Sequence, residues 1–175
     1  MIKAETELEK RILSDEDLRN GLEWGEPRSG HPEGKVILHV QQILGMIDAQ
    51  EIKGDKREKL RLLAIIHDSF KERVNRKELS MGGKNHGSLA REFAQKYIND
   101  EDLLNMLELH DKPYSIWRTY KREGKFREVA FVHMIDRIKD IQLFLDFVKL
   151  DGGVKGKSSE PRDWFEDKLR EYNKV

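Results

Sequence analysis

The chain has 175 residues with 33 basic and 33 acidic side chains, a size that suits one domain with its own core. The formal net charge of zero argues against binding to nucleic acid through bulk electrostatics, so we expect no dedicated nucleic-acid surface. Cysteine is absent, which excludes a disulfide scaffold, a thiolate zinc site and a cysteine nucleophile. Because no apolar signal core or bilayer-long apolar run occurs, we expect a cytoplasmic protein that makes no membrane contact.

The first part of the chain predicts helices and one shaped loop. Residues 5–13 form a helix, and Ser14 is a suitable N-cap for a short second one. The stretch 24–34, with three glycines and two prolines, predicts a loop. Residues 35–50 form an amphipathic helix with His39 inside its apolar stripe. A histidine in that position is either a core residue bonded to a carbonyl or a metal ligand.

The most apolar stretch of the sequence ends on two polar residues. A polar connector at 53–58 leads to a helix over 60–70, whose five apolar residues at 62–66 belong in a core. The apolar run ends on His67 and Asp68. Burying both groups is costly unless something compensates them, and a metal ion is the usual compensation. Neighbouring helical residues point in different directions, but they can converge on an ion that lies between them.

Two further histidines occupy the ends of predicted helices. His86 lies in the first turn of a helix over 86–98. The next helix is capped by Asp100 and carries His110 on its apolar face. Pro113 makes the end of that helix fall near His110. Both histidines can be metal ligands or ordinary helix-terminal residues.

The remaining sequence predicts a basic segment and two helices. Residues 114–126 interleave basic and aromatic side chains, which suits either a solvated surface or the wall of a cleft that contacts phosphate or a base. Residues 127–150 predict one long helix, whose apolar stretch is interrupted by Asp136. Gly152 and the glycine after it end this helix, and Pro161 begins the last one.

Six side chains on five predicted helices form a candidate metal-binding set, with His67 and Asp68 on the same helix. They are His39, His67, Asp68, His86, His110 and Asp136. Nitrogen and carboxylate ligands without thiolate suit Fe, Mn, Ni, Co or Zn. Six ligands exceed one tetrahedral site and suit two metals bridged by a carboxylate, with Asp68 as the bridge. If His86 and His110 have only structural roles, the other four ligands form a mononuclear site.

This ordered set resembles a known family. The order His39, His67–Asp68 and Asp136 looks like the signature of the HD-domain superfamily of metal-dependent phosphohydrolases. His86 and His110 look like the two extra ligands of its binuclear branch. The stretch 31–34 is similar to the start of HD domains attached to bacterial CCA-adding enzymes. The sequence departs from the usual motif at Ser69 and Phe70, where small residues or glycine are frequent.

The resemblance and the helical pattern together predict the fold class and its divisions. We expect an all-α, single-domain helical bundle of about seven helices. Residues 1–23 would be an N-terminal helical extension and 24–150 the HD domain. Residues 151–175 would be a linker and a C-terminal helix packed on that domain.

For chemistry, the resemblance implies hydrolysis of a small phosphate ester or nucleotide by water or hydroxide bound between two metals. Asp68 would bridge the metals, and Lys71, in a motif resembling HD-x-x-K, would contact the substrate phosphate. His31 or Glu33 is a candidate proton carrier by position. Candidates to bind a second phosphate or the far part of a nucleotide are Arg73, Arg118 and Lys121.

Two other functions fit the same ligand set. The set also resembles that of mixed-valent di-iron oxygenases, although these generally have a longer segment before the closing Asp than residues 111–135. A non-catalytic regulatory HD module would bind a nucleotide or a partner without turnover, but the complete ligand set argues against it. The sequence leaves the exact substrate, the metal and the oligomeric state open.

Overall fold

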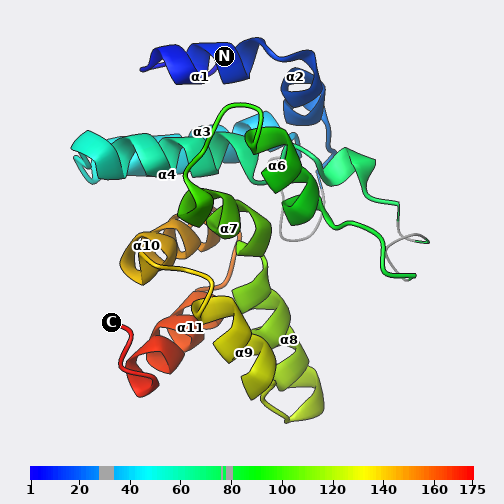
Figure 1. The fold of residues 1–175 in the computed structure, drawn as a ribbon, viewed down its shortest axis with the longest axis vertical. Helices are drawn as coiled ribbons and strands as arrows, with labels where there is room; N and C mark the ends of the chain where they lie inside the picture. The colour runs from blue at the N-terminus through cyan, green and yellow to red at the C-terminus, as the bar shows by residue number, and fades with distance from the viewer. Residues whose placement is uncertain (28–33, 76, 78–80) are drawn as a thin grey trace.

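The computed structural model describes residues 1–27, 34–75, 77 and 81–175, and every regular element within them is a helix. The predicted all-α fold is therefore confirmed, with more helices than the number expected. Figure 1 shows the N-terminal helices at one end of the long axis and α8, α9 and α11 at the other. The helices that carry or precede His39, His67, His86 and His110 lie between these two ends.

Two short helices, α1 (Glu7–Ser14) and α2 (Glu16–Glu23), begin the chain. The predicted N-cap Ser14 is wrong by one position, because the Asp15 carboxylate accepts from the backbone N–H of Asp17. A buried ion pair joins α1 to the middle of the molecule. The Arg61 guanidinium donates to both carboxylate oxygens of Glu9, at 2.7 and 2.9 Å.

The two central helices, α3 (Val36–Ala49) and α4 (Gly54–Ile66), pack against each other. The connector predicted at 53–58 is wrong, because α4 already begins at Gly54 and exposes the charged side chains of its first turns to solvent. This helix ends at Ile66, so His67 and Asp68 lie in the turn that follows it. The 3-10 helix η1 (Lys71–Arg73) comes directly after that turn.

The next pair, α6 (His86–Ala94) and α7 (Glu101–Leu109), forms the most extensive helix–helix contact of the molecule. Asn85 caps α6, and Asp100 caps α7 as the sequence predicted. The helices approach closely at Gly87, where a Cβ atom would lie 2.4 Å from the carbonyl oxygen of Glu108. Only glycine fits this crossing without moving one helix.

The last four helices are α8 (Lys112–Glu123), α9 (Glu128–Ile135), α10 (Ile141–Gly152) and α11 (Glu160–Glu171). The single helix predicted over 127–150 is wrong, because the chain turns between α9 and α10. The Asp102 carboxylate accepts from the backbone N–H groups of Lys139 and Asp140 at this turn. The Asp140 side chain then caps α10. The predicted boundary between residues 150 and 151 falls inside α10.

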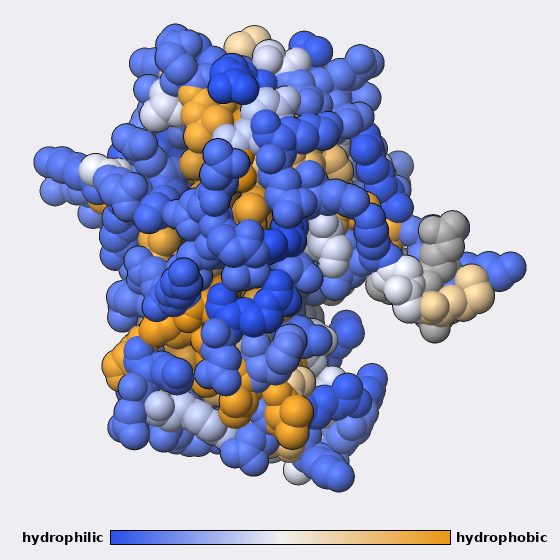
Figure 2. All heavy atoms as spheres, in the orientation of Figure 1, coloured by the Kyte–Doolittle hydropathy of each residue, from blue (hydrophilic) through white to orange (hydrophobic). Residues whose placement is uncertain are grey.

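The core runs through the whole bundle and includes residues from α1 to α11. Helix α11 packs on α8 and α10. The face shown in Figure 2 is mostly hydrophilic, with apolar atoms visible between the charged side chains. This agrees with the 38% of charged residues in the sequence. Within the described part of the chain, no helix is long and apolar enough to cross a membrane.

Candidate metal centre

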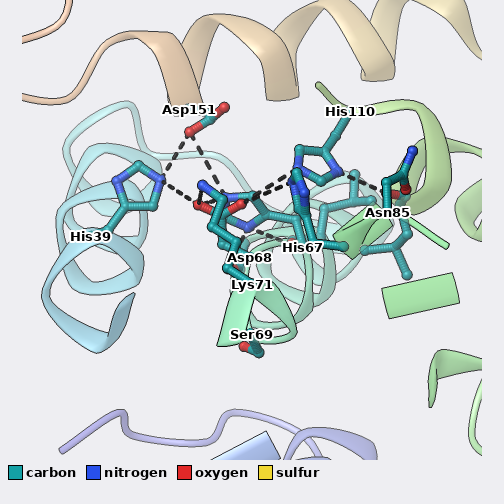
Figure 3. A network of polar contacts seen from close by, with 12 residues as sticks. His39, His67, Asp68, Ser69, Lys71, Asn85, His110 and Asp151 are labelled. Carbon is teal, nitrogen blue, oxygen red and sulfur yellow. Dashed lines mark hydrogen bonds and ion pairs between the residues drawn. The ribbon is translucent and has the colours of Figure 1, made fainter. Parts of the chain in front are cut away.

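Histidines and aspartates from five elements converge on one point in the middle of the bundle (Figure 3). Each lies on a helix or at its end, where the backbone fixes the side-chain direction. The contributing positions are His39 in α3, His67 and Asp68 after α4, His86 at the start of α6, His110 after α7, and Asp151 in the last turn of α10.

These residues form two groups of three. The first consists of His39, His67 and Asp151, and the second of Asp68, His86 and His110. Within each group one ligand atom from each residue lies within 4.8 Å of the others.

Asp68 lies between the two groups and faces both. Its Oδ2 atom is 3.5 Å from Nε2 of His67 and 3.9 Å from Nε2 of His39. Its Oδ1 atom is 3.6 Å from Nε2 of His86 and 3.5 Å from Nε2 of His110. One carboxylate oxygen therefore points at each group, which is the arrangement needed to bridge two ions.

Hydrogen bonds to backbone carbonyls orient two of the imidazoles. The Nδ1 atom of His67 lies 2.9 Å from the carbonyl oxygen of Ala64, and Nδ1 of His110 lies 2.7 Å from that of Leu107. A carbonyl only accepts, so Nδ1 is the donor in both rings and the Nε2 lone pair faces the cluster. The buried Nε2 of His67 has no hydrogen-bond partner among the described residues. A buried nitrogen lone pair of this kind fits a metal ligand.

The pKa shifts of His67, His86, Asp68 and Asp151 suit cation binding. At His110, burial alone would lower the pKa, but the Asp68 carboxylate raises it. Burial lowers the pKa of His67 to about 3, and burial together with His110 lowers that of His86 to about 3, so both rings are neutral near pH 7. Burial alone would raise the pKa of Asp68, but the Lys71 ammonium and the neighbouring histidines hold it well below its usual range. Asp151 has a similarly lowered pKa, with Lys157 as the main opposing charge. Neutral imidazoles and ionised carboxylates are the forms that bind divalent metals.

The donor set fits two divalent ions. Imidazole nitrogens and carboxylate oxygens without sulfur suit Fe, Mn, Ni, Co or Zn, as expected from the sequence. The first ion would be held by His39, His67 and Asp151, and the second by His86 and His110. Asp68 would contribute one oxygen to each.

The predicted ligand Asp136 does not lie in this centre, whereas Asp151, which the sequence analysis did not select, does. The Asp136 side chain is 62% exposed, and its nearest cation is Lys174 at 3.8 Å. Helix α9 ends at Ile135, and Asp136, in the turn that follows, is not among the residues that converge here. The sequence offers only a weak signal for Asp151, which lies one helical turn after the apolar Phe147; that Phe147 packs near His67, with ring centroids 5.3 Å apart, is visible only in the structure.

A cavity of about 510 Å³ opens beside the centre. Asp68, His110 and Asp151 line it, and so does Lys71, whose Nζ lies 2.6 Å from Oδ2 of Asp68. The remaining wall residues come mainly from α8, from the end of α10 and from the segment before α11. They include Asp111, Tyr114, Trp117, Lys157, Ser158 and Arg162.

The other predicted substrate contacts are placed differently. Arg73, Arg118 and Lys121 do not line this cavity. Arg73 pairs with Asp17 at 2.6 Å, and Lys121 pairs with Glu160 at 2.6 Å. These cations therefore serve surface ion pairs. The Arg118 guanidinium lies over the ring of Tyr114, at 5.8 Å from its centroid.

Four further residues singled out in the sequence remain to be placed. His31 and Glu33, the candidate proton carriers, lie outside the described residues. Ser69, where the sequence departs from the usual motif, points away from the cluster in Figure 3 and donates to the carbonyl oxygen of Ile65. Phe70 is buried and packs on Phe93. Both departures therefore lie on the core side of the turn.

Comparison with known proteins gives one family match. A model of the HD domain matches residues 36–139, more than half of the chain. No curated protein and no solved structure was found to match. The matched region contains His39, His67 and Asp68, while Asp151 lies beyond its end. The order of these residues along an all-helical chain, and the match itself, lead to the same conclusion: the chain belongs to the HD-domain family.

Proposed function

We propose that this protein is a metal-dependent phosphohydrolase that acts on a nucleotide or a related phosphate ester. The observation that carries this proposal is the position of Asp68, with one oxygen toward each histidine group. Two ions bridged in this way, when bound, would lower the pKa of a water molecule and neutralise charge on a phosphoryl group.

The residues of the cavity suit an anionic substrate. The Lys71 ammonium lies at the cavity edge beside Asp68, where it can donate to a phosphoryl oxygen. Because its side chain is largely buried against Asp68, its direction is fixed before substrate arrives. Lys71 would therefore orient the phosphoryl group and stabilise the charge that develops on it.

Two aromatic side chains in the cavity wall suit the base of a nucleotide. Tyr114 and Trp117 lie one turn apart on α8, with ring centroids 5.6 Å apart and planes inclined by 31°. Both rings line the cavity. The Arg118 guanidinium lies over the ring of Tyr114, at 5.8 Å from its centroid. Aromatic faces of this kind stack on nucleobases without requiring one particular base. This wall makes a nucleotide the favoured substrate class.

The first test combines metal content with phosphate release. Wild-type protein prepared with Mn or Fe is expected to hold about two equivalents of metal and to release phosphate from a panel of nucleotides. Asp68→Ala is expected to lose most of the metal and all measurable turnover, because it removes a ligand from both groups. His86→Ala is expected to keep about one equivalent, since it changes only the second group.

The control is Arg73→Ala, which removes a surface cation that does not line the cavity. It should leave metal content and phosphate release unchanged. Phosphate release that persists in Asp68→Ala would refute the proposal. A tight nucleotide complex with neither metal nor turnover would instead favour the regulatory module.

An oxygenase is the second candidate, because one observation removes the objection that the sequence raised against it. With Asp151 rather than Asp136 as the closing aspartate, the segment after His110 would be longer than residues 111–135. Segment length therefore no longer argues against a di-iron oxygenase. The lysines and the arginine of the cavity still favour phosphate chemistry. Oxygen consumption by the iron-loaded protein, without phosphate release, would reverse this order.

A further inference from the structure

The segment between α10 and α11 forms one wall of the cavity, although it lies beyond the family match. Gly156, Lys157 and Ser158 of this segment line the cavity, together with Arg162 from the first turns of α11. Gly156 has a φ of +92°, a conformation that favours glycine and brings the chain back toward the centre. The C-terminal part of the chain thus supplies two cations to the site.

Lys157 is placed beside the first histidine group. Its ammonium donates to Oδ1 of Asp151 at 2.8 Å and to the carbonyl oxygen of the same residue at 3.1 Å. Lys71 has the corresponding position beside Asp68. Each of the two lysines therefore stands next to one of the cluster's two carboxylates, with its ammonium in the wall of the cavity.

Arg162 lines the same cavity and makes no short ion pair with any residue that the structure describes. Its nearest carboxylate is that of Asp163, 3.8 Å from Nε, a distance too long for a hydrogen bond. The double glycine at the end of α10 gives this side chain room. A Cβ atom on Gly153 would lie 3.1 Å from Nη1 of Arg162, and one on Gly152 would lie 3.6 Å from its Cδ.

We propose that Lys157 and Arg162 form a second anion-binding subsite, which holds a phosphate group other than the one cleaved. The inference rests on the proposed function, because it takes the cavity to bind a phosphate ester. An ammonium and a guanidinium in one partly enclosed wall provide several donors that suit phosphate oxygens. Substrates with two or more phosphate groups are therefore bound in preference to monophosphates.

The subsite can be tested by binding alone. The probes are inorganic phosphate, which occupies one position, and methylenediphosphonate, which cannot be hydrolysed and spans two. Titration calorimetry on Mn-loaded wild-type protein should show that the diphosphonate binds at least about tenfold more tightly. Lys157→Gln and Arg162→Gln should each bring the two affinities to within about threefold of each other. Lys157→Arg, which keeps the charge, should retain most of the preference.

The matched control is Lys155→Gln, which removes a neighbouring exposed lysine that does not line the cavity. It changes net charge equally and should keep the wild-type preference. Metal content, measured in every variant, must stay at the wild-type value. Loss of metal in Lys157→Gln would mean that Lys157 only positions Asp151, and an unchanged preference would mean that no subsite exists. Either result overturns the inference. Because neither probe is turned over, a failure to find phosphohydrolase activity does not affect this test.

Discussion

Asp151 and Asp136 are both acidic residues near the ends of apolar helices, but their surroundings differ completely. Asp151 lies 2.9 Å from Nε2 of His39 and 3.8 Å from Nε2 of His67. Asp136 is exposed and meets only Lys174. At the scale of single residues, ligand identity therefore depends on which turn of which helix faces the histidines.

The exchange of Asp151 for an isosteric amide tests this assignment. Asp151→Asn is expected to lower metal affinity at the first group by at least about 100-fold, because it removes a charged ligand rather than an outer contact. Metal content should fall from about two equivalents toward one. Asp136→Asn is the control and should leave both metal content and activity unchanged. The reverse pattern, with metal lost only in Asp136→Asn, would restore the original sequence-based choice.

At this scale the sequence allowed the convergence of several side chains to be predicted, while their role as metal ligands stays a prediction. His67 and Asp68 follow a run of buried apolar residues, and this pattern has few explanations besides a metal site. His86 and His110 are brought within 3.1 Å of each other between Nε2 atoms, although each alone had an ordinary structural explanation. Asp151 was not identified because acidic residues are common at helix ends. The direction in which its side chain points depends on the earlier turn between α9 and α10.

The relative position of α6 and α7 controls the second histidine group. His86 begins α6 and His110 follows α7, so the distance between the two rings depends on how closely the helices cross. Gly87, next to His86, is the contact point with the carbonyl oxygen of Glu108. The geometry of this group therefore depends on Gly87, a residue without a side chain that could bind metal or substrate.

Gly87→Ala should separate these helices. The added Cβ would lie 2.4 Å from a backbone atom, so α6 must shift, at a cost of about 1–3 kcal/mol in the free energy of unfolding. We expect Tm to fall by roughly 2–12 °C and metal content to fall toward one equivalent. Gly45→Ala in α3 is the control, since a Cβ there meets nothing within 4 Å. It should be neutral or slightly stabilising and keep the metal. Full metal content in Gly87→Ala would show that the crossing does not position His86.

Helix boundaries were predictable only where the stop signal is local. Asp100 and Pro161 marked the starts of α7 and α11 correctly, because capping and proline act within one turn. The turn between α9 and α10 depends on Asp102, which accepts from the backbone N–H groups of two residues more than thirty positions later. No pattern within the window 127–150 carries that information, so the sequence predicted one continuous helix.

At the scale of the whole molecule, the centre joins parts of the chain that are far apart in sequence. Its candidate ligands extend from His39 in α3 to Asp151 in α10, and four of the six are buried: His39, His67, Asp68 and His110. The unfolded chain cannot hold these side chains together. Metal binding to the folded state is therefore coupled to unfolding of the entire bundle.

Metal removal should consequently lower global stability rather than loosen one helix. At a free metal concentration about 100-fold above Kd, binding adds about 2.7 kcal/mol to the free energy of unfolding. For a chain of this size, chelation is then expected to lower Tm by roughly 5–10 °C, and Mn should restore it. Asp68→Ala, which lacks the bridging ligand, should show little or no response to either treatment. Calorimetric scans with and without chelator measure this directly. An equal shift in wild type and Asp68→Ala would show that the chelator acts elsewhere and that the histidine cluster does not hold the stabilising ion.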